Sequence, residues 1–456
     1  MDISKLDSDF IENMRDLLGE NELVKFLESL KSENHIKALR VNNLKISDRE
    51  FLDVFPYELE KIPFTKNGYK LINDSISYGN TIYHHLGLFY MQEPSAMLPI
   101  TILSDYIGSK VLDLCSAPGG KATQIAPLLR DDSILVLNEI VFNRAKILKS
   151  NVERMGIRNA IITSNSPKDL EKAYPYYFDT IIVDAPCSGE GMLRKEPQVL
   201  NNWSMANVNA CATRDLEILN SADKMLEIGG HIVYSTCTLN KFENEYVIEK
   251  FIQNGKYEIV KLNSDIYNYV SHGYGSVEDA VRVFPHSSIG EGHFAVVLKK
   301  VKDDYDDIDY SEYNPYTTIK PYKKELDNIW SDIASIDYFG EPLVYKDNIF
   351  LISPLLPFYK GINIVTAGVN VASIERGRVI PHHNLVTALR KGEYNNYVDY
   401  DFDSVEIKKY MAGEVVTTNK KFKGYGTITA NGYGLGIVKN VEGTLKNHYP
   451  KAFRVK

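Results

Sequence analysis

The chain is predicted to belong to the α/β class, with a mostly parallel sheet at its centre and a smaller module at each end. Between Tyr83 and Lys300, apolar runs such as VLDLC, ILVLNE, DTIIVDAP and GHIVYST alternate with amphipathic stretches such as FNRAKILKSNVERMG. Such alternation implies parallel strands joined by crossover helices. The strand-like runs are almost wholly apolar, which indicates a sheet that is covered on both faces.

The 456 residues are too many for one hydrophobic core and indicate several domains. We expect a small α/β module over residues 1–82, the central α/β domain over 83–300, a linker and intermediate domain over 301–385, and a β-rich module over 386–456. The acidic stretch DDYDDIDYSEY at 303–313 is expected to be a solvated linker. Short strands broken by glycine, as in GYGTITANGYGLGIVKN, indicate the β-rich module.

Composition excludes several classes of protein. The hydrophobic content of 44% and the charged content of 25% are ordinary for a soluble globular protein. No run approaches the roughly 18 apolar residues of a membrane span, and the acidic start MDISKLDSDF does not look like a secretory signal. We therefore expect a cytoplasmic protein with no membrane contact. The four cysteines form no C-x-x-C pair, so we expect neither a zinc ribbon nor, in a reducing compartment, disulfides.

Two of the cysteines follow predicted strands. Cys187 stands in IIVDAPCSGEG and Cys237 in HIVYSTCTLN. In an open α/β sheet, the carboxyl ends of the strands line the ligand crevice. We therefore expect both thiols to face one pocket. Cys211 lies in a helical stretch, NVNACATRDLEILNSADKML, and is interpreted as a small buried hydrophobic residue.

A third strand ends in VLDLCSAPGGK, which predicts a ligand-binding turn. Gly119 and Gly120 allow the backbone to approach a ligand closely, and the helix that follows favours a negative group at its N-terminus. About twenty residues later, Glu139 ends the next strand and is placed to accept hydrogen bonds from ribose hydroxyls. The G-x-G-x-x-G and P-loop patterns are both missing, which counts against NAD and nucleoside triphosphates. An ordinary tight turn stays open as the alternative.

The charge is unevenly distributed. The net charge of −8 argues at first against a nucleic-acid partner. The stretch from Lys408 to Lys456 is nevertheless basic and rich in aromatic residues, as in NKKFKGYG and LKNHYPKAFRVK. Such a mixture suits contact with phosphates and stacking on bases, although a solvated surface is the plain alternative.

These motifs together resemble those of a known family. LDLCSAPGGK, VDAPCSGEGMLRK and YSTCTLNKFENE look like the S-adenosylmethionine-dependent RNA (cytosine-C5) methyltransferases of the Sun type, as do PSAML at 94–98 and RVFPHSSIGEGHF at 282–294. The tail is similar to the PUA-like RNA-binding module of the bacterial small-subunit ribosomal RNA enzymes of the RsmF group. The resemblance implies a class I methyltransferase domain with a Rossmann-like sheet and an RNA-binding N-terminal module. It also implies S-adenosylmethionine as the cofactor, and a monomer that acts on 16S ribosomal RNA or the small ribosomal subunit.

The resemblance also implies a cofactor site. Its residues would be Cys115, Ser116, Ala117, Pro118, Gly119, Gly120, Lys121, Glu139, Arg144, Asn165 and Asp184. The chain departs from many relatives in the segment TSNSP, where Asn165 and Ser166 replace an acidic residue near the adenine. An amide or a backbone group would have to make that contact here.

The chemistry requires a thiolate. Cytosine C5 becomes able to accept a methyl group only after a nucleophile adds to C6. Sequence context leaves open which cysteine attacks, because D-A-P-C also looks like the nucleophile motif of DNA cytosine methyltransferases. The RNA family implies that Cys237 attacks and that Cys187 helps to break the adduct. It also implies that Asp184 hydrogen-bonds the cytosine edge near N3 and that Lys121 holds Asp184 in place.

Other outcomes stay open. The same chemistry could act on transfer RNA, and the fold could serve a non-catalytic RNA-binding factor in ribosome assembly. In the segment GMLRKEP, Arg194 and Lys195 are expected to contact RNA phosphates. His286 and His293 are interpreted as supporting loops, and no metal site is expected.

Overall fold

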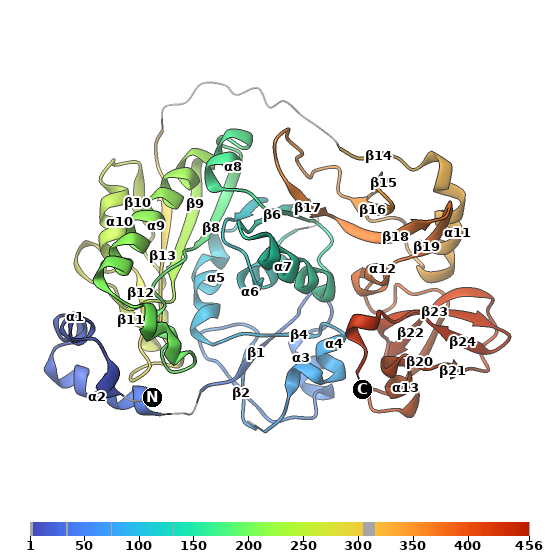
Figure 1. The fold of residues 1–456 in the computed structure, drawn as a ribbon, viewed down its shortest axis with the longest axis horizontal. Helices are drawn as coiled ribbons and strands as arrows, with labels where there is room; N and C mark the ends of the chain where they lie inside the picture. Colours follow the sequence, from blue (N-terminus) through green and yellow to red (C-terminus); the bar gives the residue numbers. More distant parts are fainter. Residues whose placement is uncertain (1–2, 33–34, 74, 131, 304–314, 456) are drawn as a thin grey trace.

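A computed structural model describes residues 3–32, 35–73, 75–130, 132–303 and 315–455. Residues 304–313 of the predicted acidic linker lie outside these described residues. Within these ranges the chain forms four sheets, with the largest at the centre (Figure 1). No helix in the described ranges combines the length and the apolar character needed to cross a bilayer.

The central sheet has ten strands. Its middle is parallel, in the order β7 (Ala160–Thr163), β6 (Ile134–Asn138), β5 (Lys110–Asp113), β8 (Phe178–Asp184) and β9 (Leu226–Thr236). Its edges are antiparallel: β13 (His293–Lys300), β12 (Val281–Val283), β11 (Ser271–His272) and β10 (Tyr257–Ile259) on one side, and β17 (Ile364–Ala367) on the other. The predicted Rossmann-like, mostly parallel sheet is therefore confirmed at its centre.

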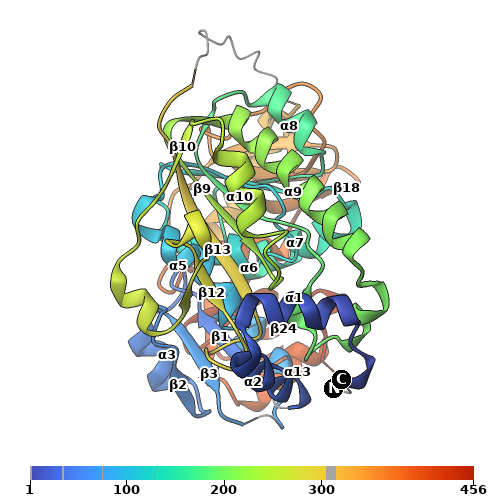
Figure 2. The ribbon, with the colours of Figure 1, turned by 90° about the vertical axis from the view of Figure 1, so that its left-hand side faces the viewer.

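Helices cover both faces of this sheet. Successive residues of a strand point to opposite faces, so Val111 packs in one apolar core and Leu112 in the other. The first core includes α5 (Leu98–Leu103), α6 (Gly120–Ile125) and α7 (Phe142–Met155). The second includes α8 (Pro167–Ala173), α9 (Met205–Met225) and α10 (Glu245–Ile252), and Figure 2 shows α9 and α10 across that face.

The N-terminal region has two parts. One is a four-stranded sheet of β2 (Leu59–Lys61), β3 (Gly68–Leu71), β1 (Ala38–Val41) and β4 (Phe89–Met91), with α3 (Asp48–Val54) and α4 (Ile82–His85). The other part is the pair of helices α1 (Ser8–Leu18) and α2 (Glu20–Lys31). These helices pack against the central domain, with Phe10 of α1 edge-on to Trp203 at 5.5 Å.

The C-terminal part contains two five-stranded sheets. The first comprises β14 (Thr317–Thr318), β15 (Glu341–Tyr345), β16 (Asn348–Ile352), β18 (Val369–Glu375) and β19 (Arg378–Pro381), with α11 (Lys323–Ile333) and α12 (His383–Ala388). The second comprises β20 (Tyr397–Tyr400), β22 (Gly424–Ala430), β23 (Tyr433–Val441), β24 (Thr444–Asn447) and β21 (Val416–Thr417), with α13 (Val405–Ala412). The predicted β-rich C-terminal module is therefore confirmed. Its core is continuous with that of the N-terminal sheet, because Phe89 and Tyr410 belong to one apolar cluster.

Candidate active site

A cavity of about 720 Å³ opens at the carboxyl ends of β5, β6 and β8. Strand order reverses at β5, since β6 lies on one side of it and β8 on the other, and open α/β sheets bind ligands at such a reversal. The walls include Pro118 from the turn after β5, Glu139 after β6, and both Cys187 and Cys237. The structure thus brings together the glycine turn, the acidic residue and the two thiols that the sequence singled out.

The turn after β5 is fixed by a glycine at the start of α6 and by two hydrogen bonds from α7. Gly119 caps the N-terminus of α6 in the left-handed conformation, at φ 112°, which favours glycine. Two side chains of α7 fix the carbonyl groups of the turn. Arg144 Nη2 donates to the oxygen of Ala117 at 2.8 Å, and Asn151 Nδ2 donates to the oxygen of Pro118 at 2.9 Å.

Arg40 of β1 supports the turn from behind, and sequence reasoning gave it no role. Its side chain is completely buried. It donates to the backbone oxygens of Thr123 at 3.0 Å and Gly120 at 3.3 Å, and to Gln92 Oε1 at 2.9 Å. Burial lowers the pKa of Arg40 to about 9, so the guanidinium stays charged at neutral pH. An arginine inside the otherwise apolar strand ALRV was the signal that could have identified it.

Glu139 and Asn165 differ in what their side chains face. Glu139 is 2% exposed, accepts from the Val141 N–H at 2.9 Å and lies 3.4 Å from Arg144 Nη1. Its carboxylate belongs to the cavity wall. The amide of Asn165 instead pairs with the backbone of Asn363, donating at 3.3 Å and accepting at 3.1 Å. The cavity wall in this region is formed by 166–168.

The two thiols form a pair. The Sγ atoms of Cys187 and Cys237 lie 3.2 Å apart, and both residues are half-buried. The hydrogen bond with Cys237, together with burial, raises the pKa of Cys187 well above its usual value. Cys187 is therefore a protonated thiol at neutral pH, and a protonated thiol is a poor nucleophile. Cys211 lies in α9 away from the cavity wall, where burial raises its pKa to about 11.

Two buried carboxylates tie the cysteine loops to each other. Glu190 follows Cys187 in the sequence and accepts from the backbone N–H groups of Leu239 at 3.0 Å and Asn240 at 2.8 Å. Glu243 lies beyond Cys237 and accepts from the Ser188 N–H at 2.7 Å. The glutamate of each loop thus accepts hydrogen bonds from backbone N–H groups of the other loop. These bonds fix the distance between the two thiols. Both glutamates belong to recognised motifs, but their pairing could not be read from the sequence.

Gly191 lies where the two loops touch. Its N–H donates to the carbonyl oxygen of Cys237 at 2.9 Å. A Cβ atom at this position would lie 2.5 Å from the oxygen of Gly292 and 2.8 Å from the oxygen of Cys237. Only glycine allows this close approach of three backbone segments.

Asp184 ends β8 and carries a negative charge. Lys121 Nζ lies 2.7 Å from Asp184 Oδ2, and Ser235 Oγ donates to Oδ1 at 2.8 Å. Burial on its own would raise the pKa of Asp184, but Lys121, His293 and these hydrogen bonds outweigh it and lower the pKa. Nearby, burial and then the charge of Asp184 raise the pKa of Asp113 to about 7. Burial, with Lys121 close by, lowers the pKa of His293 to about 3.

The expectation that Arg194 contacts RNA phosphates is wrong. Its Nε lies 2.6 Å from Glu291 Oε2, and the two side chains are only 8% and 1% exposed. The local sequence GMLRKEP looks polar, but the loop folds over its own arginine. Lys195 is half-buried, and its phosphate contact stays a prediction. Among the described residues, no group of three or more histidine, cysteine, aspartate or glutamate side chains could hold a metal ion.

The cavity fits an adenosylated amino acid. Glu139 offers a carboxylate for ribose hydroxyls, and the turn around Pro118 exposes backbone groups for a charged amino acid. Apolar lining residues such as Ile140 suit a nucleobase, and Cys187 and Cys237 belong to the same lining. This set of residues matches the S-adenosylmethionine that the resemblance implied.

The fold and this site define a class I methyltransferase. Family models agree along the chain: residues 100–299 match the model described as "16S rRNA methyltransferase RsmB/F", 6–94 the "N-terminal domain of 16S rRNA methyltransferase RsmF", and 397–455 the "Methyltransferase RsmF PUA domain". The chain belongs to the ribosomal RNA small subunit methyltransferase F family.

Named relatives cover almost the whole chain. The ribosomal RNA small subunit methyltransferase F of Vibrio vulnificus YJ016 is 30% identical over 431 residues, which cover 91% of this chain and 90% of the relative. The protein of the same name from Shewanella sediminis is 30% identical over 467 residues, which cover 98% of this chain and 96% of the relative. A solved methyltransferase homologue from Pyrococcus horikoshii superposes with a TM-score of 0.58 at 27% identity, over 66% of this chain and 100% of that protein.

Proposed function

We propose that this chain transfers a methyl group from S-adenosylmethionine to C5 of cytosine in 16S ribosomal RNA, through a covalent bond between Cys237 and C6. The thiol pair carries the proposal: two sulfur atoms 3.2 Å apart, of which Cys187 keeps its proton, at the wall of a cofactor-sized cavity. When bound, S-adenosylmethionine supplies an electrophilic methyl group. The target base must leave its stack to reach this cavity.

Cys237 acts as the nucleophile. Its thiolate adds to C6, a carbon–sulfur bond forms, and the electron pair moves onto the ring so that C5 can take the methyl group. A proton then leaves C5 to water while the bond from C6 to sulfur breaks. The thiol of Cys187 donates a hydrogen bond to the departing sulfur and so stabilises the thiolate leaving group. The contact between the two sulfur atoms is symmetric, so the assignment of release to Cys187 and attack to Cys237 follows the family that the motifs resemble.

Asp184 and Lys121 orient the base. Lys121 keeps Asp184 ionised, as the lowered pKa indicates. A carboxylate only accepts hydrogen bonds, so it recognises the exocyclic amino group of cytosine beside N3. Uracil carries a carbonyl oxygen in that place, which would face the carboxylate unfavourably. The pair therefore also favours cytosine over uracil.

The cofactor roles rest on the cavity wall. Glu139 binds the ribose, and residues 115–121 hold the methionine part. Of that segment, Cys115, Ala117 and Pro118 line the cavity. Arg144 lines the cavity beside Glu139 and also fixes the turn through Ala117. Asn165 supports the adenine end from outside the cavity wall, because its side chain pairs with Asn363 and its backbone N–H and C=O pair with the side chain of Asn138. Ser166 is the lining residue there.

The RNA partner is inferred from the modules and the relatives. We propose RNA-binding modules at both ends, predicted as 1–82 and 386–456, with the N-terminal module extended to Met91 because β4 belongs to its sheet. Residues 83–300 are the predicted methyltransferase domain and 301–385 the connecting region, whose strand β17 adds to the edge of the methyltransferase sheet. The relatives that match over nine-tenths of this chain are named for the small-subunit ribosomal RNA, which favours 16S ribosomal RNA over transfer RNA.

Methyl transfer to small-subunit RNA tests the proposal. Cys237→Ala is expected to abolish 5-methylcytosine, and Cys187→Ala to accumulate a protein–RNA adduct that survives a denaturing gel. Cys211→Ala is the matched control, because that thiol lies outside the cavity wall. Full activity of Cys237→Ala would overturn the nucleophile assignment, and adduct-free turnover by Cys187→Ala would overturn the release role. Bisulfite mapping in a deletion strain distinguishes 16S ribosomal RNA from transfer RNA, and unchanged methylation of both would favour a non-catalytic assembly factor.

A further inference from the structure

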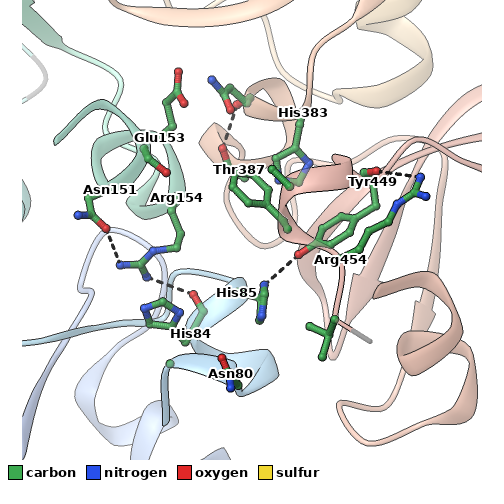
Figure 3. Close-up of a pocket in the computed structure, with 16 residues that line it drawn as sticks. Asn80, His84, His85, Asn151, Glu153, Arg154, His383, Thr387, Tyr449 and Arg454 are labelled. Atoms are coloured by element: carbon green, nitrogen blue, oxygen red, sulfur yellow. Dashed lines mark hydrogen bonds between the residues drawn. The ribbon is translucent and has the colours of Figure 1, made fainter. Parts of the chain in front are cut away.

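A second cavity, of about 570 Å³, lies where the N-terminal sheet, the central domain and the C-terminal segment meet (Figure 3). One wall is α7, with Asn151 and Arg154. The opposite wall is the C-terminal segment, with Tyr449 and Arg454, and α4 with its two histidines forms the floor. It shares no lining residue with the cofactor cavity.

Aromatic rings dominate one side of this second cavity. The ring of His383 lies 5.6 Å from that of Tyr449 and 5.8 Å from that of Phe453, and His85 Nδ1 lies 3.0 Å from the Tyr449 hydroxyl. Tyr449 is buried, so it anchors the group, whereas Phe453 is 41% exposed. The rings meet at steep angles, with interplanar angles of 83° between His383 and Tyr449 and 54° between His383 and Phe453, so they form an aromatic corner whose exposed member is Phe453.

Two guanidinium groups line the same cavity. Arg154 Nη1 donates to the backbone oxygen of His84 at 3.1 Å, and Arg454 Nη2 donates to that of Tyr449 at 3.4 Å. Neither partner is a carboxylate, so these bonds hold the guanidinium groups in place without neutralising them. Glu153 also lines the cavity, but burial raises the pKa of its carboxyl group and Lys149 Nζ lies 3.6 Å from it, so the two guanidinium groups give the lining its positive charge.

The histidines supply uncharged polar groups. Burial, helped by neighbouring cations, lowers the pKa of His84 and of His383 to about 3, so both rings are neutral at pH 7. A neutral imidazole offers one donor and one acceptor nitrogen. Nδ1 of His383 is buried and makes no hydrogen bond within the described part of the chain.

We propose that this cavity binds one unpaired nucleotide of the substrate RNA near the target cytosine. Flat rings and guanidinium planes are the surfaces on which proteins stack unpaired bases, and fixed arginines suit the adjoining phosphate. The volume lies in the range of sites for single small ligands. The inference rests on the proposed function for the nature of the RNA.

The position of the cavity supports a nucleotide close to the target. Helix α7 joins the two sites, since Arg144 lines the cofactor cavity and Asn151 lines this one. A rise of 1.5 Å per residue separates the two positions by about 10 Å along the helix. Asn151 also holds the carbonyl of Pro118 in the cofactor turn. A nucleotide seated here would therefore lie directly behind the turn.

The test compares variants of the full-length protein. Phe453→Ala and His383→Ala remove rings that line the cavity, and His448→Ala is a matched control, because that ring lies in the C-terminal module outside the lining. Affinity for a small-subunit RNA fragment is measured by fluorescence anisotropy, and methyl transfer by kcat and KM. We expect the Kd and KM for RNA to rise about ten-fold in the two cavity variants, the loss expected for one base stack, without a matching fall in kcat.

Several outcomes would overturn the proposal. One is a Kd for Phe453→Ala within two-fold of that for His448→Ala. Another is the case in which free nucleoside monophosphates bind tightly and lose affinity in Phe453→Ala, while the affinity for RNA does not change in that variant. That result would assign the cavity to a free nucleotide. If His383→Ala fails to fold, the partly exposed Phe453 still gives the answer. If RNA binding depends on the cavity but no cytosine is methylated, the proposed function fails and the cavity assignment stands.

Discussion

A methyl group added at Gly191 should uncouple the two thiols. In Gly191→Ala the new Cβ would lie 2.5 Å from the oxygen of Gly292 and 2.8 Å from that of Cys237, where real contacts essentially never fall below 3.0 Å. Both neighbours are backbone atoms, so the segments of Gly292 and Cys237 both have to move, by about half an ångström at Gly292 and by a smaller distance at Cys237. Overpacking of this kind costs about 1–3 kcal/mol of stability. Misplacing a reacting group by about 1 Å costs on the order of 100-fold in rate, so we expect a loss of roughly 10- to 100-fold in kcat.

Single-turnover methyl transfer at saturating RNA and S-adenosylmethionine measures this loss, with cofactor affinity as the check on folding. Gly189→Ala is the control in the same loop. It introduces left-handed strain, at φ 78°, of about 1–2 kcal/mol, but its nearest neighbour is Val199 at 3.7 Å and not the Cys237 loop. If Gly191→Ala turns over within two-fold of Gly189→Ala, the spacing of the thiols does not depend on this contact and the reasoning fails.

Three further predictions concern charge and redox state. Asp113 in the folded protein holds a proton up to about pH 7, so on its account the free energy of unfolding should fall by about 3 kcal/mol between pH 4 and 7. Asp113→Asn should lose that fall in urea titrations, and an unchanged pH dependence would contradict the burial argument. Lys121→Met removes the cation that lowers the pKa of Asp184, so the acid limb of the pH–rate profile should move to higher pH. A profile that falls in maximal rate without shifting along the pH axis would show that Lys121 does not act through the pKa of Asp184. Hydrogen peroxide should oxidise Cys187 and Cys237 to a disulfide, with reduction of the peroxide to two water molecules, and should thereby inactivate the enzyme. Dithiothreitol should restore activity. If mass spectrometry finds both thiols free after inactivation, a disulfide between Cys187 and Cys237 is excluded as the cause.

Elements with strong local patterns were predictable. The apolar runs of β5, β6 and β8 have few polar interruptions, so each could be read as a buried strand. Gly119 before a helix predicted the turn, and the left-handed φ gives the reason for glycine. The local sequence failed at Arg194, which was expected to contact RNA but pairs with Glu291. A polar loop sequence does not reveal whether the loop folds back on itself.

Contacts between distant segments were not predictable. Arg40 precedes the cofactor turn by about eighty residues and reaches it only because β1 packs behind α6. Strand β17 (Ile364–Ala367) joins the edge of the central sheet at β7, although it follows the predicted methyltransferase domain in the sequence. The second cavity depends on His85 meeting Tyr449 across nearly the whole chain. None of these pairings has a local signature, since each depends on where separate modules dock.

The sequence by itself determined the class of fold and the position of the pocket, because strand periodicity and the residues after each strand are local properties. It also placed Cys187 and Cys237 at one sheet edge, since parallel strands end on the same side. Only the tertiary structure decided how those thiols are arranged and what surrounds them. The distance of 3.2 Å, the proton retained on Cys187 and the ionised state of Asp184 all arise from burial and from neighbours that folding supplies. Electrostatic interactions depend on the distance between groups and on the access of water, and the sequence alone specifies neither.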